Sequence, residues 1–200
     1  MYSPSDFVEA EGVVQFIQQT VQGILLSVDE GKIEATHLPF IYEPNDFKGR
    51  LLSHMARNNN QWRALNGVEV LIVFQGPHAY ISPSWYKNPD VPTWNYAVAH
   101  VRGTLNIIEN DAVQHELLHK SVASFEPEGG WGLEKLSGGI DQLLKHIVCF
   151  VVNIDSIEGK FKLSQNRSTQ DQCSVVENLE QLGGAMQLAI ARLMRERISS

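Results

Sequence analysis

Short strand-like runs joined by tight turns limit most strongly what this chain can fold into. The segment 23–43, GILLSVDEGKIEATHLPFIYE, predicts two strands on either side of the turn Asp29-Glu30-Gly31. Alternating or apolar runs predict further strands at residues 50–56, 69–76, 94–109 and 146–163. We expect Gly103 to mark a bulge or bend, and the last run to be one bent strand or a strand pair. This succession favours a mainly β fold with α additions, an antiparallel barrel, over a parallel α/β sheet.

Helical patterns precede, interrupt and follow the strands. They span residues 6–20, 56–65, 111–126 and the segment from 168 to the end. In the second pattern the asparagines can cap the helix start, and in the third we expect Asp111 to be the cap. The last pattern predicts one or two helices broken at Gly183-Gly184. We therefore expect a barrel domain at 1–165 and a C-terminal helical extension at 166–200 packed on it.

The segment 76–100, GPHAYISPSWYKNPDVPTWNYAVAH, concentrates aromatic residues and prolines. It holds three of the five tyrosines, two of the four tryptophans and four of the eight prolines. Aromatic residues at this density usually form core, and alternation would place Trp94, Tyr96, Val98 and His100 on one face of a strand. The four prolines between Pro77 and Pro92 predict a rigid loop instead, of the kind that lines binding sites.

Charge, cysteines and apolar runs exclude several classes of protein. The net charge of −7 argues against a large basic surface for nucleic acid, and the locally basic part is the tail with Arg192, Arg195 and Arg197. Cys149 lies in an apolar run and Cys173 is the other cysteine, so a disulfide framework is not expected and the chain reads as cytoplasmic. The sequence predicts neither an export signal nor a membrane span, and it contains neither the GxGxxG nor the Walker pattern.

A first candidate site combines THLPF at 36–40 with SHMARNNNQW at 53–62. Arg57 lies where a strand passes into a helix, and Asn58 follows it with further donors at the helix start. Cations and amides in this position suit a phosphate group. The alternative is that the asparagines only cap the helix and that Arg57 is a solvated charge.

A second candidate site is EGKFKLSQNRS at 158–168. Alternation places Lys160 and Lys162 on one face of a strand, with Phe161 and Leu163 on the other. The segment therefore has one cationic face. Edge strands of many proteins carry lysines in this way to prevent aggregation, which is the alternative explanation.

A third pattern, HELLH at 115–119, matches the zinc-binding sequence H-E-x-x-H. On a helix His115 and His119 would share a face and Glu116 could act as general base. The extended form of the pattern fails, because Val122 and Phe125 stand where a glycine and a histidine are required. We expect these histidines to be surface residues of an amphipathic helix and to bind no metal.

Six segments together resemble one family closely and in order. They are MYSPSDF, ATHLPF, SHMARNNNQW, VFQGPHAYISPSWY, VPTWNYAVAHVRG and EGKFKLSQNRS. The chain resembles the PaiB-like FMN-binding proteins, which are negative transcriptional regulators, from residue 1 to about residue 180. It departs from the family pattern at Asp6, where a histidine is usual, at Ser53, where a glycine is usual, and at Asn60, where a proline is usual.

The resemblance implies an FMN-binding split β-barrel of the flavin reductase and pyridoxamine-phosphate oxidase type. It implies a homodimer with FMN near the subunit interface, the phosphate at the end of a strand and the start of the next helix, and the KFKLSQNR segment contributed by the partner subunit. Trp85, Tyr86, Trp94 and Tyr96 would form an aromatic wall beside the flavin ring or the dimer seam. The residues expected to bind FMN are Thr36, His37, His54, Arg57, Asn58, Trp94, Lys160, Lys162, Gln165 and Arg167.

Two functions remain open from the sequence. One is an FMN-binding negative transcriptional regulator, with promoter DNA as a partner that the charge supports only weakly. The other is a flavin-dependent oxidoreductase that acts on a small molecule and affects transcription indirectly. A flavin carries its own redox chemistry, so the absence of an obvious nucleophile or acid pair fits both.

Overall fold

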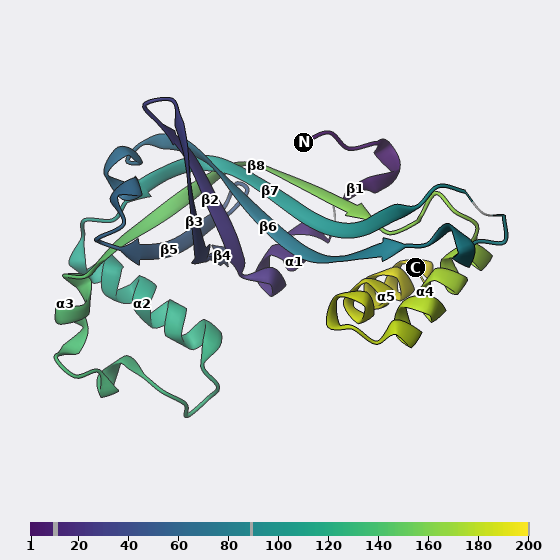
Figure 1. Cartoon of the computed structure of the whole chain (residues 1–200). Helices are drawn as coiled ribbons and strands as arrows, with labels where there is room; N and C mark the ends of the chain where they lie inside the picture. Colours follow the sequence, from purple (N-terminus) through teal and green to yellow (C-terminus); the bar gives the residue numbers. More distant parts are fainter. Residues whose placement is uncertain (10–11, 89, 200) are drawn as a thin grey trace. The chain divides into compact units, whose positions relative to one another are not determined.

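The computed structural model describes residues 1–9, 12–88 and 90–199 (Figure 1). The chain forms two compact units. Unit 1 comprises Met1–Phe16, Gln75–His100 and Glu158–Ser200, and unit 2 comprises Ile17–Phe74 and Val101–Ile157. Each unit is assembled from segments that are distant in the sequence, so neither corresponds to one continuous stretch of chain.

Antiparallel pairing of β-strands dominates the fold. The strands are β1 Val8–Glu9, β2 Gln22–Asp29, β3 Lys32–Pro39, β4 Ile41–Glu43, β5 Arg50–Ala56, β6 Val68–Ile81, β7 Thr93–Ile107 and β8 Ile147–Lys162. Their hydrogen-bonded order is β3-β2-β6-β7-β8-β5-β4, and β1 pairs with β8. The prediction of a mainly antiparallel β fold with α additions is confirmed. The last predicted run, for which one bent strand and a strand pair were both open, forms the single strand β8.

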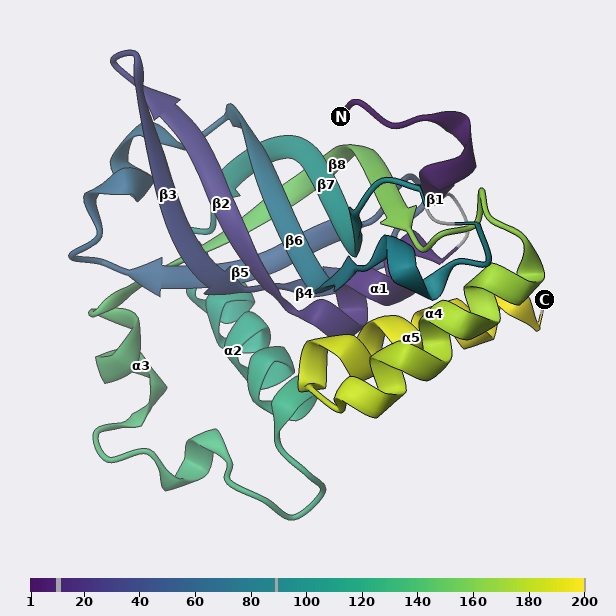
Figure 2. The ribbon, with the colours of Figure 1, turned by 45° about the vertical axis from the view of Figure 1, so that its right-hand side comes forward.

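The β2–β3 hairpin of unit 2 follows its predicted turn. Asp29 pairs with Lys32, and the two residues between them, Glu30 and Gly31, have φ angles of 47° and 78°. Positive φ at both central residues matches the right-handed twist of the flanking strands. Figure 2 shows β2 and β3 side by side with this turn between them.

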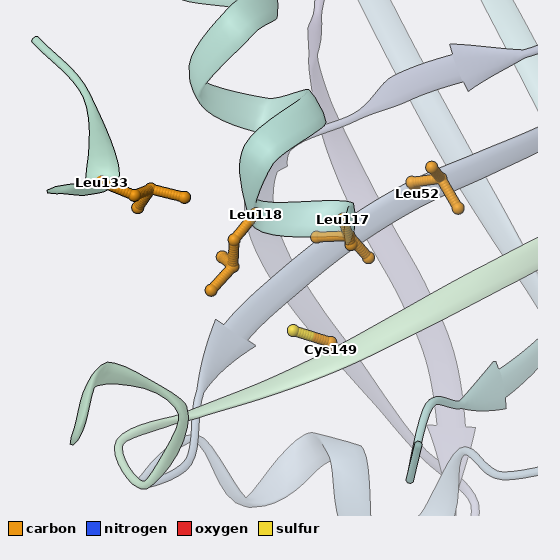
Figure 3. Packing of buried hydrophobic residues seen from close by; sticks show 5 residues of the cluster. All are labelled: Leu52, Leu117, Leu118, Leu133 and Cys149. Carbon is orange, nitrogen blue, oxygen red and sulfur yellow. The ribbon is translucent and has the colours of Figure 1, made fainter. Parts of the chain in front are cut away.

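Helix α2, Asp111–Phe125, covers an apolar cluster in unit 2. Leu117 and Leu118 are buried against Leu52, Leu133 and Cys149 (Figure 3). The predicted cap is wrong by one residue: the side chain of Asn110 accepts the hydrogen bond from the Val113 amide, and Asp111 is the first helical residue. Its charge there still complements the helix dipole. Helix α3, Gly139–Leu144, and the 3-10 helix η4, Leu133–Lys135, follow α2.

Gly103 is required by the close approach of β7 and β8 in unit 2. A Cβ atom at this position would lie 2.2 Å from the carbonyl oxygen of Asn153 and 2.8 Å from Cγ1 of Val152. No side chain fits between backbones at that separation, so the glycine is explained by steric exclusion.

The predicted N-terminal helix is only partly correct. Helix α1 spans Val13–Thr20, whereas Ser5–Phe7 form a 3-10 helix and Val8–Glu9 form β1. Val8 pairs with Lys160 of β8, so strand pairing competes successfully with helix formation there. Ala10 and Glu11 of the predicted helix lie outside the described residues.

The C-terminal helices belong to unit 1 and break where predicted. Helix α4 spans Thr169–Leu182 and helix α5 spans Ala185–Ile198. Gly183 ends α4 with a φ of 67°, a conformation that glycine adopts without steric cost. Figure 2 shows the two helices side by side. The division of the chain at residues 165 and 166 stays a prediction.

The predicted proline-rich loop is wrong at its start, because β6 continues through Pro77 to Ile81. A proline fits a strand where its missing N–H faces no partner. The register of β2 with β6 spans Leu71–Val73, so Pro77 lies beyond that pairing. Pro83 opens the short 3-10 helix η3, Pro83–Trp85, and Pro89 lies outside the described residues.

Candidate functional site

The predicted FMN-binding residues fall into two groups, one in each unit. Unit 2 holds Thr36, His37, His54, Arg57 and Asn58. Unit 1 holds Trp94, Lys160, Lys162, Gln165 and Arg167. This division parallels the two candidate segments of the sequence, of which the second was expected to come from a partner subunit.

Arg57 directly follows β5 and is held by backbone carbonyls. Its guanidinium donates to the carbonyl oxygens of Lys145 at 3.1 Å, Leu144 at 3.4 Å and Ile147 at 2.7 Å. Arg57 also borders a surface hollow of about 540 Å³ that contains Lys145 and two aspartates, Asp111 and Asp141. Its charge is therefore engaged within unit 2, which the sequence could not indicate.

Asn58 is an exposed turn residue between β5 and the short helix η2, Asn60–Ala64. The expected helix is present as a 3-10 helix, and its cap is Asn59, whose side chain accepts from the Gln61 amide at 3.1 Å. Asn58 and Asn60 are both exposed, and the Asn60 side chain accepts from Arg63 at 3.3 Å. This placement keeps Asn58 and Arg57 adjacent at the surface.

A polar network fixes this turn on the β2–β3 hairpin. Thr36 donates to the Gln61 side chain at 2.5 Å and accepts from Asn59 at 2.8 Å. The Gln61 amide donates to the buried Ser27 hydroxyl at 2.9 Å. Sequence reasoning missed Ser27 and Gln61, because only the fold brings them to Thr36, and it named Asn59 only as a cap or donor at the helix start. Thr36 therefore acts first as a structural link, while His37 beside it is exposed.

His54 lies on β5 and is half-buried. Burial lowers the pKa of His54 from its ordinary value, since the charged imidazolium loses hydration. The neighbouring Ser53, which replaces the usual family glycine, is buried, and its hydroxyl donates to the Pro39 carbonyl at 2.7 Å. This serine thereby ties β5 to the end of β3.

The cationic face predicted on β8 is present in unit 1. Phe161 and Leu163 are buried, 7% and 2% exposed, while Lys160 and Lys162 occupy the alternate positions. Lys162 donates to the Trp94 carbonyl at 2.8 Å and to the Thr93 hydroxyl. Burial lowers the pKa of Lys162, and the charges of Lys160 and Arg167 lower it further. An anion bound at this cluster would relieve that repulsion.

The turn after β8 uses two of the predicted residues differently. Gln165 accepts from the Leu163 amide and donates to the Phe161 carbonyl, both at 2.6 Å, so its side chain shapes the turn. Arg167 pairs with Asp90 at 2.7 Å and lies over the Tyr86 ring at 4.7 Å from its centroid. The Tyr86 hydroxyl is buried without a hydrogen-bond partner among the described residues.

The aromatic face of β7 is exposed. The buried residues of the strand include Asn95, Ala97 and Ala99, whereas Trp94 on the opposite face is 53% exposed. The expected sharing of one face by Trp94 and Tyr96 is confirmed, but this face is not core. A surface hollow of about 350 Å³ is lined by Gln75, Gly76, His78, Trp94, Tyr96, Ala97 and Val98.

Lys160 connects this hollow to the cationic face. Its ammonium lies 5.5 Å from the centroid of the Tyr96 ring and donates to the Tyr2 carbonyl at 3.1 Å. Trp94 contacts His78 and Tyr80 with ring centroids 6.0 Å apart in each pair. Trp85 belongs to η3, and its carbonyl accepts from Ser174. The predicted four-residue wall therefore reduces to Trp94 and Tyr96 at the hollow, with His78 as a member that sequence reasoning missed.

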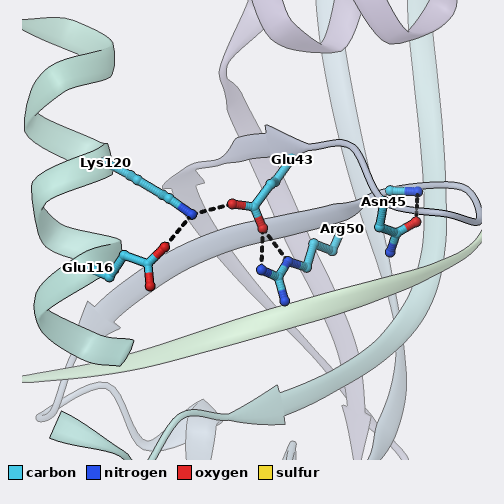
Figure 4. A network of polar contacts seen from close by, with 6 residues as sticks. Glu43, Asn45, Arg50, Glu116 and Lys120 are labelled. Carbon is cyan, nitrogen blue, oxygen red and sulfur yellow. Dashed lines mark hydrogen bonds and ion pairs between the residues drawn. The ribbon is translucent and has the colours of Figure 1, made fainter. Parts of the chain in front are cut away.

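Two of the HELLH residues, His115 and Glu116, contact charged side chains of unit 2. His115 contacts the Asp141 carboxylate at 2.8 Å, and Glu116 pairs with Lys120 at 2.7 Å. Lys120 also binds Glu43, which binds Arg50 (Figure 4). Within residues 1–9, 12–88 and 90–199, no group of three histidine, cysteine or acidic side chains is arranged to hold a metal ion. The absence of bound metal stays a prediction.

The residues of both groups fit the chemistry of FMN. Arg57, Asn58 and His37 are all exposed in unit 2, where they offer a cation and polar donors. Unit 1 offers an aromatic hollow rimmed by Lys160 and Lys162, which suits a planar ring with polar edges. None of the predicted residues is acidic, although Asp111 and Asp141 border the hollow beside Arg57.

Three comparisons identify relatives of the chain. Residues 1–156 match the family described as "Putative FMN-binding domain". The chain is 37% identical over 205 residues, 99% of its length and 98% of the relative's, to "Protease synthase and sporulation protein PAI 2" of Bacillus subtilis. This relation extends beyond the family match into the C-terminal helices.

Solved structures share the split-barrel fold. The flavocytochrome Anf3 from Azotobacter vinelandii has a TM-score of 0.62 at 18% identity, with 76% of this chain and 67% of that chain covered. The FAD and heme binding protein from Mycobacterium smegmatis has a TM-score of 0.60 at 15% identity, with 82% and 77% covered. None of the helices in the described part of the chain is long and apolar enough to span a membrane.

Proposed function

The chain belongs to the FMN-binding domain family, and from this premise we propose that it is an FMN-binding negative transcriptional regulator. FMN is its cofactor and the split barrel its fold. The observation that carries the regulatory role is the relation over 99% of the chain to the Bacillus subtilis protein, whose name refers to protease synthesis and sporulation. Both free cysteines are consistent with a cytoplasmic location.

We assign FMN to a homodimer in which each copy contributes one group of residues. In this proposal Thr36, His37, His54, Arg57 and Asn58 hold the phosphate end. Trp94, Lys160, Lys162, Gln165 and Arg167 of the second copy surround the ring. The exposed aromatic face of β7 supports this assignment, since exposed aromatic hollows are uncommon without a ligand or partner. Sedimentation of the FMN-loaded protein as a monomer at micromolar concentration would contradict it.

Bound FMN supplies the capacity to accept and donate electrons. The chain's own residues bind and orient it: cations oppose the phosphate charge, and the aromatic side chains exclude water from the ring. Lys162, which donates to the Trp94 carbonyl, would place a cation beside the bound ring and would favour negative charge there.

The regulatory effect does not require direct operator binding. The net charge is −7. In helix α5 Arg192 pairs with Glu196 at 3.0 Å and Arg195 pairs with Glu180 at 2.7 Å. These pairs neutralise part of the basic tail that was the candidate DNA contact. We therefore propose that promoter DNA is bound weakly or through a partner protein.

Transcript measurement tests the regulatory role. In a strain without the chain, we expect a defined set of transcripts to rise, and the wild-type chain should restore their lower level. An unchanged transcript profile would refute the role. Anisotropy with a promoter fragment and a scrambled duplex across a salt series tests the mode of action. We expect equal, salt-sensitive weak binding, and sequence preference would establish direct recognition instead.

A second candidate is a flavin-dependent oxidoreductase acting on a small molecule. The hollow of about 350 Å³ beside Trp94 and Tyr96 favours it, because its size is that of a small-molecule site. Mixing the anaerobic FMN-loaded protein with NADH or NADPH tests this candidate. Loss of the flavin absorbance band within seconds supports it, whereas an unchanged band with both reductants counts against it.

A further inference from the structure

Asn95 is a fully buried polar residue on β7, directly between Trp94 and Tyr96. Its side chain is 0% exposed. The amide nitrogen donates to the Ser164 hydroxyl at 3.0 Å, and that hydroxyl donates back to the amide oxygen at 3.2 Å. The amide nitrogen also lies 3.5 Å from the sulfur of Met194 in helix α5. Asn95 thus joins β7, the turn after β8 and the C-terminal helix within unit 1.

Ser164 occupies a conformation that this turn has to enforce. Its φ is 62°, in the left-handed region, and it is 4% exposed. A serine leaves this region unless surrounding contacts hold it there. The turn has internal bonds, in which Arg167 N donates to the Ser164 carbonyl at 2.9 Å and the Gln165 side chain bonds the backbone of Phe161 and Leu163. The bond to Asn95 ties this turn to the neighbouring strand.

The residues that flank this bond are those assigned to FMN. Lys162 lies two positions before Ser164 and Arg167 three positions after it, while Trp94 immediately precedes Asn95. Lys162 also donates to the Trp94 carbonyl at 2.8 Å. Because Asn95 points into the core and Trp94 to the surface, the amide does not touch the exposed aromatic face. It can affect a ligand there only by fixing where its neighbours stand.

We propose that Asn95 is a positioning residue for the flavin site, which acts by holding Ser164 so that the turn presents Lys162 and Arg167 beside Trp94. This inference rests on the proposed assignment of these residues to FMN. Removal of the Asn95–Ser164 bond leaves Lys162, Arg167 and Trp94 in the chain but frees the turn that orders them. Binding of FMN then has to order the turn, and the entropy lost in doing so lowers the affinity for FMN.

A double-mutant design separates positioning from stability. Asn95→Leu leaves the Ser164 hydroxyl buried and without its Asn95 partner, and Ser164→Gly leaves the Asn95 amide oxygen without its donor, so each variant should unfold at lower temperature without FMN. The double variant Asn95→Leu/Ser164→Gly has neither unpaired partner, and glycine accepts the positive φ. It should regain most of the lost thermal stability.

FMN affinity, measured by fluorescence quenching, gives the decisive result. We expect all three variants to bind FMN roughly tenfold more weakly, a change of about 1.4 kcal/mol, even where the double variant has recovered its stability. Recovery of wild-type FMN affinity together with stability in the double variant would show that the bond is only structural and would overturn the proposal. Wild-type affinity in the folded Ser164→Gly variant would overturn it equally.

Two further variants make the result specific. Asn106→Leu is the matched control, since Asn106 lies on the same strand and its amide donates to the Thr104 carbonyl of that strand, and it should leave FMN affinity unchanged. Equal weakening by Asn106→Leu would overturn the proposal. Lys162→Ala tests the underlying assignment. Unchanged FMN affinity in that variant would remove Lys162 from the site, whereas the role of Asn95 is judged from the double variant.

Discussion

The guanidinium of Arg57 donates a hydrogen bond of 2.7 Å to the backbone carbonyl of Ile147, the first residue of β8. The residue predicted to bind the FMN phosphate therefore also fastens the end of β5 to the start of β8. Any substitution of Arg57 acts on both roles, and an experiment has to distinguish them.

Arg57→Ala should weaken FMN binding by roughly ten- to a hundredfold. The expected loss is a charge-assisted contact of about 1.5 to 3 kcal/mol, and about 1.4 kcal/mol corresponds to a factor of ten. Riboflavin lacks the phosphate, so its affinity should hardly change. Both flavins can be titrated by fluorescence quenching, with circular dichroism to monitor the fold. Equal losses for the two flavins would assign Arg57 to its carbonyl contacts alone.

Glu43→Gln should lower the free energy of unfolding at neutral pH. The variant should then lose less of this free energy than the wild type when the pH is lowered. Burial raises the pKa of Glu43, but hydrogen bonds from Lys120 and Arg50 outweigh it, so the pKa of Glu43 lies below its ordinary value of 4.5. A lowered carboxyl pKa contributes stability above pH 4.5 that is lost as pH falls through the lower folded-state value. The carboxylate is 21% exposed, so we expect an effect on the order of 1 kcal/mol.

Urea unfolding of wild type and Glu43→Gln between neutral and acidic pH measures this difference. Glu128→Gln is the control, because Glu128 is exposed. This variant should have the same free energy of unfolding as the wild type at neutral and at acidic pH. Parallel pH profiles for wild type and Glu43→Gln would show that the Lys120–Glu43–Arg50 network of Figure 4 does not stabilise the fold.

Native protein should expose one reactive thiol per chain. Burial raises the pKa of the Cys149 thiol to about 11, and Cys149 is packed within the apolar cluster of α2, whereas Cys173 is exposed. A colorimetric thiol reagent should modify Cys173 quickly and both cysteines only after denaturation. Cys173→Ser should abolish the fast phase. A fast phase that persists in this variant would mean that the cluster around Cys149 opens.

Gly103→Ala should be much more destabilising than Gly67→Ala. The alanine Cβ at 103 would lie 2.2 Å from the Asn153 carbonyl oxygen, so β7 and β8 would have to separate, at a cost on the order of 3 kcal/mol. Gly67 has a φ of 76° but free space around it, so alanine there should cost roughly 1 to 2 kcal/mol of backbone strain. Thermal unfolding ranks the two variants, and the reverse order would contradict the close packing of β7 and β8.

His115→Ala and His119→Ala should each leave folding and FMN binding intact. His115 loses its contact with Asp141, whose side chain is 85% exposed, so the expected change in stability is below about 1 kcal/mol. Elemental analysis of the purified wild type should find no stoichiometric zinc. Zinc that is present in the wild type and lost in either variant would establish the metal site that the HELLH pattern resembles.

Local sequence determined most of the strands, because their signals are short-range. The Glu30-Gly31 turn needs positive φ at two positions, and the alternation of Lys160, Phe161, Lys162 and Leu163 already separates a polar from an apolar face. The motifs of the candidate site were likewise sufficient to recognise the family, since they are long and occur in order. These features depend on residues that are neighbours in the chain.

Only the tertiary structure decided which faces are buried and which polar groups are already paired. Alternation predicts that Trp94 and Tyr96 share a face, but not that the opposite face with Asn95 is the core. Nothing in the sequence indicated that the Gln165 side chain also shapes the turn, where its amide donates to the Phe161 carbonyl. The reason is that burial and hydrogen-bond pairing depend on partners distant in sequence, such as Ser164 for Asn95, and a local pattern contains no information about such partners.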